Sequence, residues 1–264
     1  MFPGVNAWAR EKLYFKRIIK LTDTGKTKLI VALDVETADR ALSLFEELRS
    51  VAGMFKIGSQ LFTAAGPDIV REIIAKGGRV FLDLKFHDIP NTVAAAGVEA
   101  TRLGVSIFNV HASGGMEMMK RTADAVSETA IREGIERPNV IAVTLLTSID
   151  DKALGEISIN TAAKQLVIHF ARAAADSGLA GVVASPQEIE LIRTVVPQQN
   201  FLIVTPGIRS ATDAANDQRR TMTAAEAVRA GADYLVVGRP ITSAVDRVEA
   251  ARRIVVDMTA ALND

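Results

Sequence analysis

The chain has 264 residues, 48% of them apolar, which is enough for one barrel-sized domain or two small ones. Its formal net charge is zero, which argues against a general affinity for nucleic acid or for an anionic membrane surface. The absence of cysteine excludes disulfides, thiolate metal sites and cysteine catalysis, and no apolar run approaches the ~18 residues of a membrane-spanning helix. Charged residues interrupt the N-terminal segment where a signal peptide would be apolar, so we expect a cytoplasmic protein.

The first 28 residues differ from the rest in composition. They contain seven Lys and Arg residues against two Asp and Glu residues, and the only tryptophan, Trp8. No Pro-, Gly- or Ser-rich linker divides the remainder. We therefore expect a short N-terminal extension at residues 1–28 and a single catalytic domain at residues 29–264.

Eight short runs rich in Val, Ile and Phe follow, with helical patterns between them. Their nearly continuous apolarity indicates parallel strands that are covered on both faces. Eight β-α units in about 235 residues predict a (β/α)8 TIM barrel, with a doubly wound open sheet as the alternative. The expected strands are 29–34, 54–59, 79–85, 105–112, 139–146, 179–185, 201–208 and 234–241, and the amphipathic helical segments include 38–51, 91–103, 116–133 and 161–177.

Charged side chains stand at the carboxyl ends of several of these strands, where parallel barrels form active sites. In "FLDLKFHDIPNT" (81–92), Asp83 and Lys85 are two residues apart and should face the same side of a strand. Burying an ammonium and a carboxylate in a partly dry site is costly unless they pair. Asp34 and Lys56, on the first two strands, can add alternating charge. Such a network favours a charged Lys85 that donates a proton over a neutral Schiff-base nucleophile.

Any one of these charged residues, taken alone, can equally well be a surface residue that contacts solvent. The prediction of an active site depends on the charged residues coming from several strands. The motifs "TPGIR" and "VVGRPI" extend it to the seventh and eighth strands, after which this architecture commonly binds phosphate. Gly238 allows backbone N–H groups to approach an anion, and Arg209 and Arg239 can add charge-assisted contacts. The polar segment 210–220 is either a lid that closes Gln218 over a ligand or a solvated loop.

The three histidines do not have the spacing of a metal site. His111 ends the fourth strand and is either a site residue or structural, whereas His87 and His169 are expected to be structural. Neither GxGxxG nor GxxxxGK[ST] occurs, so a dinucleotide-binding protein or a P-loop NTPase lacks support.

The motifs described so far resemble those of the orotidine 5′-phosphate decarboxylase family. "LDLKFHDIPNTV" is similar to that family's signature, with Asp83, Lys85 and Asp88 in its Asp-x-Lys-x-x-Asp pattern. The resemblance continues through "VALD", "FKIG", "VTLLTS", "TPGIR", "NDQRR" and "VGRPI". It spans Leu29 to about Ile241 and leaves residues 1–28 outside.

The resemblance implies a cofactor-independent homodimer that converts orotidine 5′-monophosphate to UMP and CO2 in de novo pyrimidine biosynthesis. Lys85 would protonate a C6 carbanion, and Asp83 and Asp88 would line the reacting carboxylate. Active sites would be shared across the interface, with Asp88 and Thr92 supplied by the partner subunit. The other implied contacts are with the ribose hydroxyls (Asp34, Lys56), the pyrimidine edge (Thr147) and the phosphate (Arg209, Gln218, Gly238, Arg239).

Two alternatives stay open. Sugar-phosphate decarboxylases and hexulose-phosphate synthases share Asp-x-Lys-x-x-Asp, so the same barrel would suit a metal-dependent decarboxylase or aldolase that acts on a sugar phosphate. "HDIPNT" and the Gln218 segment favour the nucleotide substrate. The non-enzymatic alternative is a barrel that binds a phosphorylated ligand without turnover, and the intact Asp-Lys-Asp set speaks against it.

Overall fold

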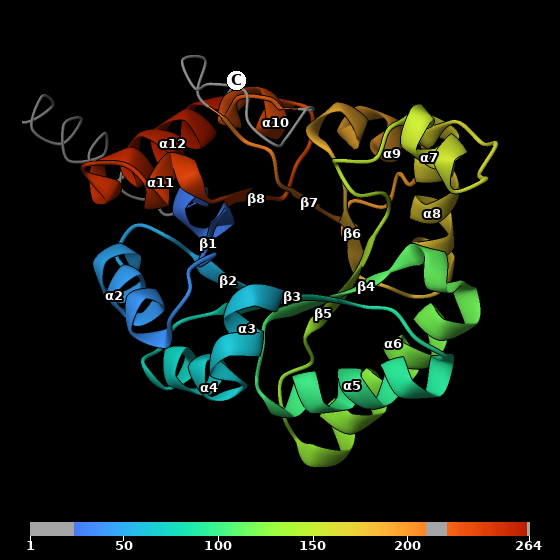
Figure 1. The fold of residues 1–264 in the computed structure, drawn as a ribbon, viewed down its shortest axis with the longest axis horizontal. Coiled ribbons are helices and arrows are strands. Elements are labelled where there is room, and N and C mark those ends of the chain that lie inside the picture. The colour runs from blue at the N-terminus through green and yellow to red at the C-terminus, as the bar shows by residue number, and fades with distance from the viewer. Residues whose placement is uncertain (1–23, 210–220, 263–264) are drawn as a thin grey trace, which may run out of the picture.

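Eight parallel strands close into a barrel in the order β1 to β8 (Figure 1). The structure is a computed structural model that describes residues 24–209 and 221–262. β1 pairs with both β2 and β8, which confirms the predicted (β/α)8 barrel and rejects the open doubly wound sheet. The strands are β1 (Leu29–Ala32), β2 (Met54–Gly58), β3 (Val80–Phe86), β4 (Ile107–His111), β5 (Asn139–Val143), β6 (Gly181–Val183), β7 (Leu202–Thr205) and β8 (Tyr234–Val237).

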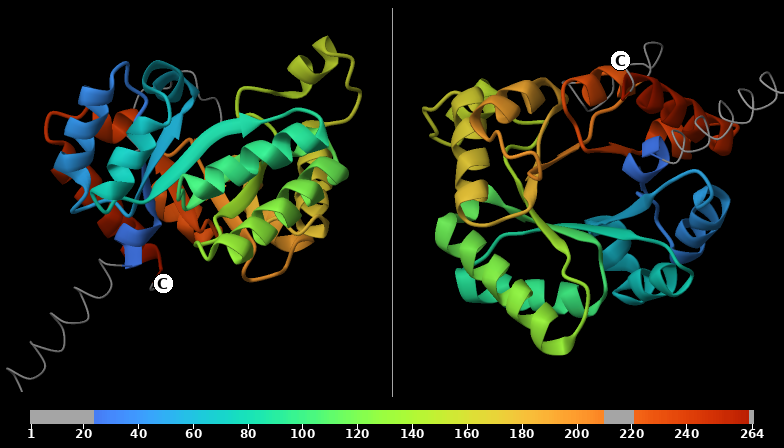
Figure 2. Two further views of the ribbon diagram at one scale, coloured as in Figure 1. Left: turned by 90° about the horizontal axis from the view of Figure 1, so that it is seen from below. Right: turned by 180° about the vertical axis from the view of Figure 1, so that it is seen from behind.

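Helices form the outer layer around this sheet (Figures 1 and 2). None of the described helices is long and apolar enough to cross a membrane. The β5–α8 connection, which carries α7, stands out beyond one end of the barrel (Figure 2). The helices are α2 (Ala38–Leu48), α3 (Ser59–Ala65), α4 (Asp68–Ala75), α5 (Pro90–Arg102), α6 (Met116–Glu133), α7 (Asp151–Glu156), α8 (Ala163–Asp176), α9 (Ile189–Val195), α10 (Ala224–Arg229), α11 (Arg239–Thr242) and α12 (Arg247–Ala261).

Most strands end earlier than the apolar runs predicted. The run expected to continue to residue 146 leaves the sheet after Val143, and the run expected to reach residue 241 leaves it after Val237. Residues beyond these points, including Leu145 and Pro240, line a cavity instead of pairing with a neighbouring strand. Apolar sequence therefore continued past the sheet because it forms part of the wall of a site.

Two apolar layers follow from the alternation of side chains along each strand. Residues such as Val31, Phe55 and Leu82 point outward and pack under the helices. The alternate residues point inward and fill the barrel, so the interior is a packed floor and not a pore. The buried inward layer consists of Ile30, Ala32, Met54, Phe81, Ile107, Ile141, Val204 and Val236.

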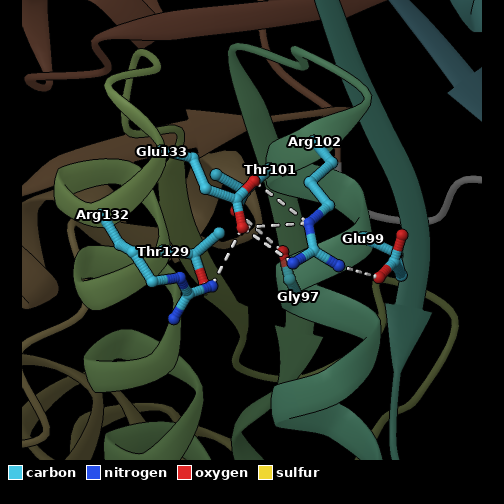
Figure 3. A network of polar contacts seen from close by, with 7 residues as sticks. All are labelled: Gly97, Glu99, Thr101, Arg102, Thr129, Arg132 and Glu133. Carbon is cyan, nitrogen blue, oxygen red and sulfur yellow. Dashed lines mark hydrogen bonds and ion pairs between the residues drawn. The ribbon is translucent and has the colours of Figure 1, made fainter.

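The pair α5 and α6 is closely packed on one side of the barrel (Figure 1). A Cβ atom at Gly97 of α5 would lie 3.1 Å from the side chains of both Phe108 and Thr122, so the glycine permits this approach. Arg102 at the end of α5 binds Glu133 at the end of α6, with an Nη2–Oε1 distance of 2.7 Å (Figure 3). Hydrogen bonding to Arg102 lowers the pKa of Glu133 to about 2. The carboxylate thus stays ionised and joins the two helix ends.

Candidate active site

A cavity of about 550 Å³ lies at the carboxyl ends of the strands, a volume typical of small-molecule sites. Strand ends from most of the barrel contribute to it. Eight of the site residues predicted from the sequence line this one cavity: Asp34, Lys56, Asp83, Lys85, Thr147, Arg209, Gly238 and Arg239.

Strand alternation explains how the charged residues reach the cavity. In β1 the inward residues Ile30 and Ala32 belong to the apolar floor, and Asp34 follows two positions later. In β2, Met54 belongs to the same floor and Lys56 stands one step above it. The sequence therefore places apolar residues at the bottom of the barrel and charged ones at its mouth, on the same inward face.

A continuous chain of alternating charge crosses the first three strands. Asp34 Oδ1 lies 2.7 Å from Lys56 Nζ, Lys56 Nζ lies 3.3 Å from Asp83 Oδ2, and Asp83 Oδ1 lies 2.6 Å from Lys85 Nζ. The two inner side chains, Lys56 and Asp83, are only 10% and 12% exposed, whereas Lys85 is 34% exposed. Both buried charges are thus compensated, as burial in a partly dry site requires.

The electrostatics of Lys56 show which influence prevails. Burial alone disfavours the ammonium and would lower its pKa, but the carboxylates of Asp83 and Asp34 outweigh burial and raise the pKa of Lys56 above its ordinary value. Lys56 is accordingly a fixed positive charge at neutral pH.

Lys85 has a backbone φ of +54°, in the left-handed region that residues other than glycine rarely adopt. Such a conformation costs ~1–3 kcal/mol and persists only where the surroundings impose it. It coincides with a break in the β3–β4 pairing, because the register shifts between Leu82 and Phe86. The two-residue spacing predicted a regular strand through Lys85. The strand is instead irregular at Lys85, whose side chain still reaches Asp83.

Asn109 of β4 completes this group and was missed by the sequence reasoning. Its side chain is fully buried; Oδ1 accepts the backbone N–H of Lys85 at 2.8 Å, and Nδ2 donates to Asp83 Oδ1 at 2.7 Å. The signal was present in "SIFNVH", because Asn109 follows Ile107 by two and so faces inward above the apolar floor.

The wall formed after β7 and β8 carries the cationic residues of the predicted phosphate site. Arg209 is half-buried and Arg239 exposed, and both line the cavity with Gly238. β7 lies four strands from β3 in the eight-stranded ring, so Arg209 and Lys85 stand on opposite sides of the mouth. Two arginines thus line the cavity after β7 and β8, and the ion-paired series lines it on β1 to β3.

Asp88 and Thr92 do not line the cavity of their own chain. Both are exposed, and Asp88 Oδ1 accepts the N–H of Ile89 at 2.6 Å. Ile89 itself is 66% exposed. Gln218 lies outside the described residues.

Two of the histidines, His87 and His111, lie close to each other outside the cavity lining. His111 does not line the cavity and instead stacks near His87, with ring centroids 5.4 Å apart. Burial first, and then the neighbouring His87, lower the pKa of His111, which favours its neutral form. Within residues 24–209 and 221–262, no three or more His, Asp or Glu side chains are grouped in a way that could hold a metal ion.

The fold and the cavity define a (β/α)8-barrel protein with a charged small-molecule site at the carboxyl ends of its strands. Residues 27–254 match the family described as "Orotidine 5′-phosphate decarboxylase / HUMPS family", and the chain belongs to this family. The resemblance inferred from the motifs is thereby confirmed.

Individual relatives agree with the family. The chain is 52% identical over 238 residues to the orotidine 5′-phosphate decarboxylase of Geobacter sulfurreducens, covering 90% of this chain and 98% of the relative. It is 50% identical over 238 residues, with the same coverage, to the enzyme of that name from Geotalea daltonii. The crystal structure of orotidine 5′-phosphate decarboxylase from Lactobacillus acidophilus superposes with a TM-score of 0.76 at 35% identity, covering 87% of this chain and 98% of that chain.

Proposed function

We propose that this chain decarboxylates orotidine 5′-monophosphate to UMP and CO2 in pyrimidine biosynthesis, with Lys85 as the proton donor to C6. The observation that carries the proposal is the ion-paired series Lys56–Asp83–Lys85 in a cavity whose far side holds Arg209 and Arg239. Membership of the family supports the same activity, as do the relatives named orotidine 5′-phosphate decarboxylase, which are 50% and 52% identical to this chain in sequence.

The chemistry explains why such a charge series is useful. When the C6–carboxylate bond breaks, its electron pair stays on C6 in the plane of the ring, where no adjoining π system spreads it. The Lys85 ammonium stabilises this pair and then transfers a proton, so that an N–H bond breaks as the C6–H bond forms. Asp83 holds the ammonium in place at 2.6 Å. Preorganised charge of this kind is usually the largest single contribution to the ~8–23 kcal/mol by which enzymes lower a barrier.

The rest of the cavity suits the rest of the nucleotide. Arg209, after β7 and opposite Lys85, would bind the phosphate together with Gly238 and Arg239 after the neighbouring strand β8. Asp34 and Lys56, at the β1–β2 end of the series, would hold the ribose hydroxyls between the phosphate and the pyrimidine. Thr147 would contact the pyrimidine edge, and Gln218 is proposed as a further phosphate ligand from the sequence alone.

A purified sample tests the activity directly. Loss of orotidine 5′-monophosphate is followed by its ultraviolet absorbance in the presence of EDTA. Turnover that survives the chelator supports the proposal, whereas turnover that needs a divalent ion favours the metal-dependent alternative. The Lys85→Ala variant should lose at least ~10²-fold in kcat yet still bind UMP, because the phosphate and ribose contacts remain. A variant that keeps more than a few per cent of wild-type kcat would show that the proton donor is misassigned.

We also propose a homodimer in which Asp88 and Thr92 complete the partner's site. Both residues are exposed on their own chain beside the exposed Ile89, which is what a position covered by a second subunit would look like. The cytoplasmic location and the separate N-terminal extension stay predictions.

Mixing two inactive variants, Lys85→Ala and Asp88→Ala, tests the shared site. One site of a mixed dimer carries both lesions, and the other combines an intact Lys85 with an intact Asp88. Random exchange makes half of the dimers mixed, so about a quarter of wild-type sites should return by the two-fold symmetry of the interface. Native mass spectrometry first establishes that mixed dimers form, and mixed dimers without activity would refute the sharing of Asp88.

A further inference from the structure

We infer that Asn109 is a positioning residue for the proton donor, because its side-chain amide fixes both the backbone of Lys85 and the carboxylate that holds the Lys85 ammonium. The inference rests on the proposed function and extends it to a residue that does not line the cavity. Asn109 therefore acts through Lys85 and Asp83 and not through contact with the substrate.

The β3–β4 pairing isolates Asn109 opposite the irregular segment. Leu82 pairs with Phe108 and Phe86 pairs with Val110, so three residues of β3 (83–85) face the single residue Asn109 of β4. Regular backbone pairing cannot span this mismatch. The Asn109 side chain reaches across it and accepts the Lys85 N–H, which would otherwise be a partly buried donor without its strand partner.

The hydrogen bonds form a closed ring that contains both ends of the lysine. Asn109 Oδ1 binds the Lys85 backbone, and Asn109 Nδ2 binds Asp83 Oδ1. Lys85 Nζ binds the same Asp83 Oδ1 at 2.6 Å. The position of Nζ is thus set from two directions, through the left-handed backbone of Lys85 and through the orientation of the Asp83 carboxylate.

Asparagine has the chemistry that this ring requires. A backbone N–H can only donate, so it fixes the side-chain oxygen of Asn109 toward Lys85, and the NH2 group then faces the carboxylate of Asp83. Leucine has a similar size but neither group. Aspartate keeps the acceptor for Lys85 but places a second carboxylate against Asp83, unless it is protonated and donates as the amide does.

Two substitutions and one control test the inference. Asn109→Leu and Asn109→Asp should lower kcat for orotidine 5′-monophosphate at least about tenfold, because small misplacements of a catalytic group cost large factors. Their KM should stay within about threefold, because no direct substrate contact is lost. The control, Thr122→Val, removes another fully buried hydrogen bond, that of Thr122 Oγ1 with the Met118 carbonyl at 2.8 Å, on α6. The kcat of Thr122→Val should stay within about twofold of wild type, even if this variant lowers the melting temperature as much as the two variants at position 109 do.

The pH dependence of the aspartate variant separates positioning from general damage. A protonated Asp at position 109 restores a donor to Asp83. The ratio of the Asn109→Asp kcat to the wild-type kcat should therefore be several-fold higher at about pH 6 than at about pH 8. The other titratable groups around this point are present in both proteins: Asp83 and Lys85 from β3, Lys56 from β2, Asp34 after β1, His111 from β4 and His87 beside it. The ratio of the two profiles therefore isolates position 109.

Each outcome decides the inference. Variants at position 109 with kcat within about threefold of the Thr122→Val control, or a pH-independent ratio, would overturn it. Should Asn109→Leu fail to fold, Asn109→Asp decides, since it keeps the size and the acceptor. Should wild type not decarboxylate, the proposed function fails, and crystal structures of the folded variants then decide about Asn109. Lys85 retaining its left-handed backbone and its contact with Asp83 would refute the positioning role.

Discussion

Asp83→Asn removes a carboxylate that forms ion pairs with both lysines of the site. The side chain keeps its size, but the ammonium groups of Lys56 and Lys85, now at 3.3 and 2.6 Å from Asp83, lose their common counter-charge. Lys56 keeps its ion pair with Asp34, whereas Lys85 has no ion pair with a second carboxylate among the described residues. The variant therefore lowers both stability and activity.

The structure sets the size of each effect. Breaking a fully buried ion pair costs ~3–5 kcal/mol. Lys85 is 34% exposed and Lys56 is still paired with Asp34, so about 1–3 kcal/mol is expected here. For a protein of this size that corresponds to a fall in Tm of about 3–10 °C. In kcat we expect a loss of ~10²–10³, as for other single preorganised electrostatic groups.

Asp68→Asn is the matched control. Its ion pair with Arg71 is also short, at 2.7 Å, but both side chains are largely exposed on α4, so the change should cost less than ~1 kcal/mol and leave kcat unchanged. Differential scanning calorimetry and the ultraviolet assay measure the two quantities for both variants. Suppose that Asp83→Asn keeps kcat within about tenfold of wild type and has the same Tm as Asp68→Asn. The ion pair with Asp83 would then not be what positions Lys85.

Three further predictions concern other parts of the molecule. Gly58→Ala should lower kcat/KM roughly tenfold with little change in Tm, because the new Cβ would lie 3.0 Å from Lys56 Nζ while the backbone φ of −94° suits alanine. Arg239→Ala should raise KM for orotidine 5′-monophosphate but not for orotidine, and equal effects on both would refute a phosphate contact. Glu133→Gln should lower Tm at pH 7, since Arg102 lowers the pKa of Glu133 from 4.5 to about 2. Stability from a lowered carboxyl pKa is present above pH 4.5 and lost toward pH 2, so the difference in Tm should narrow over that range.

Much of the barrel was predictable because its strands are apolar on both faces and its helices are amphipathic. Helix α6 begins and ends at the predicted residues, and α5 lies within one residue of its predicted bounds. The strand ends were less predictable, since apolar residues such as Leu145 line the cavity and look like strand residues in the sequence. Hydrophobicity reports burial and does not distinguish burial in a sheet from burial in the wall of a site.

The charge series was predictable in its members but not in its geometry. The spacing of Asp83 and Lys85 correctly suggested that they meet, but a regular strand would not have needed Asn109. The irregularity arises from a pairing mismatch between β3 and β4, which is a property of two segments about 25 residues apart. Local patterns in one segment cannot reveal this mismatch. The one signal in the sequence was the spacing of Asn109, which follows the inward-facing Ile107 by two residues.

The distribution of charge around the cavity relates its two halves to the two ends of the proposed substrate. On the β1–β3 side, the ammonium groups of Lys56 and Lys85 are matched in number by the carboxylates of Asp34 and Asp83. No other carboxylate lines the described cavity, and Arg209 and Arg239 line it after β7 and β8. A phosphate would meet these two arginines, whereas the substrate carboxylate would enter a set of charges that is already balanced. Binding energy is thus available far from the bond that breaks, where it can hold the nucleotide in place. Loss of neutral CO2 would leave the negative charge on C6, and Lys85 would then neutralise it by giving its proton to C6.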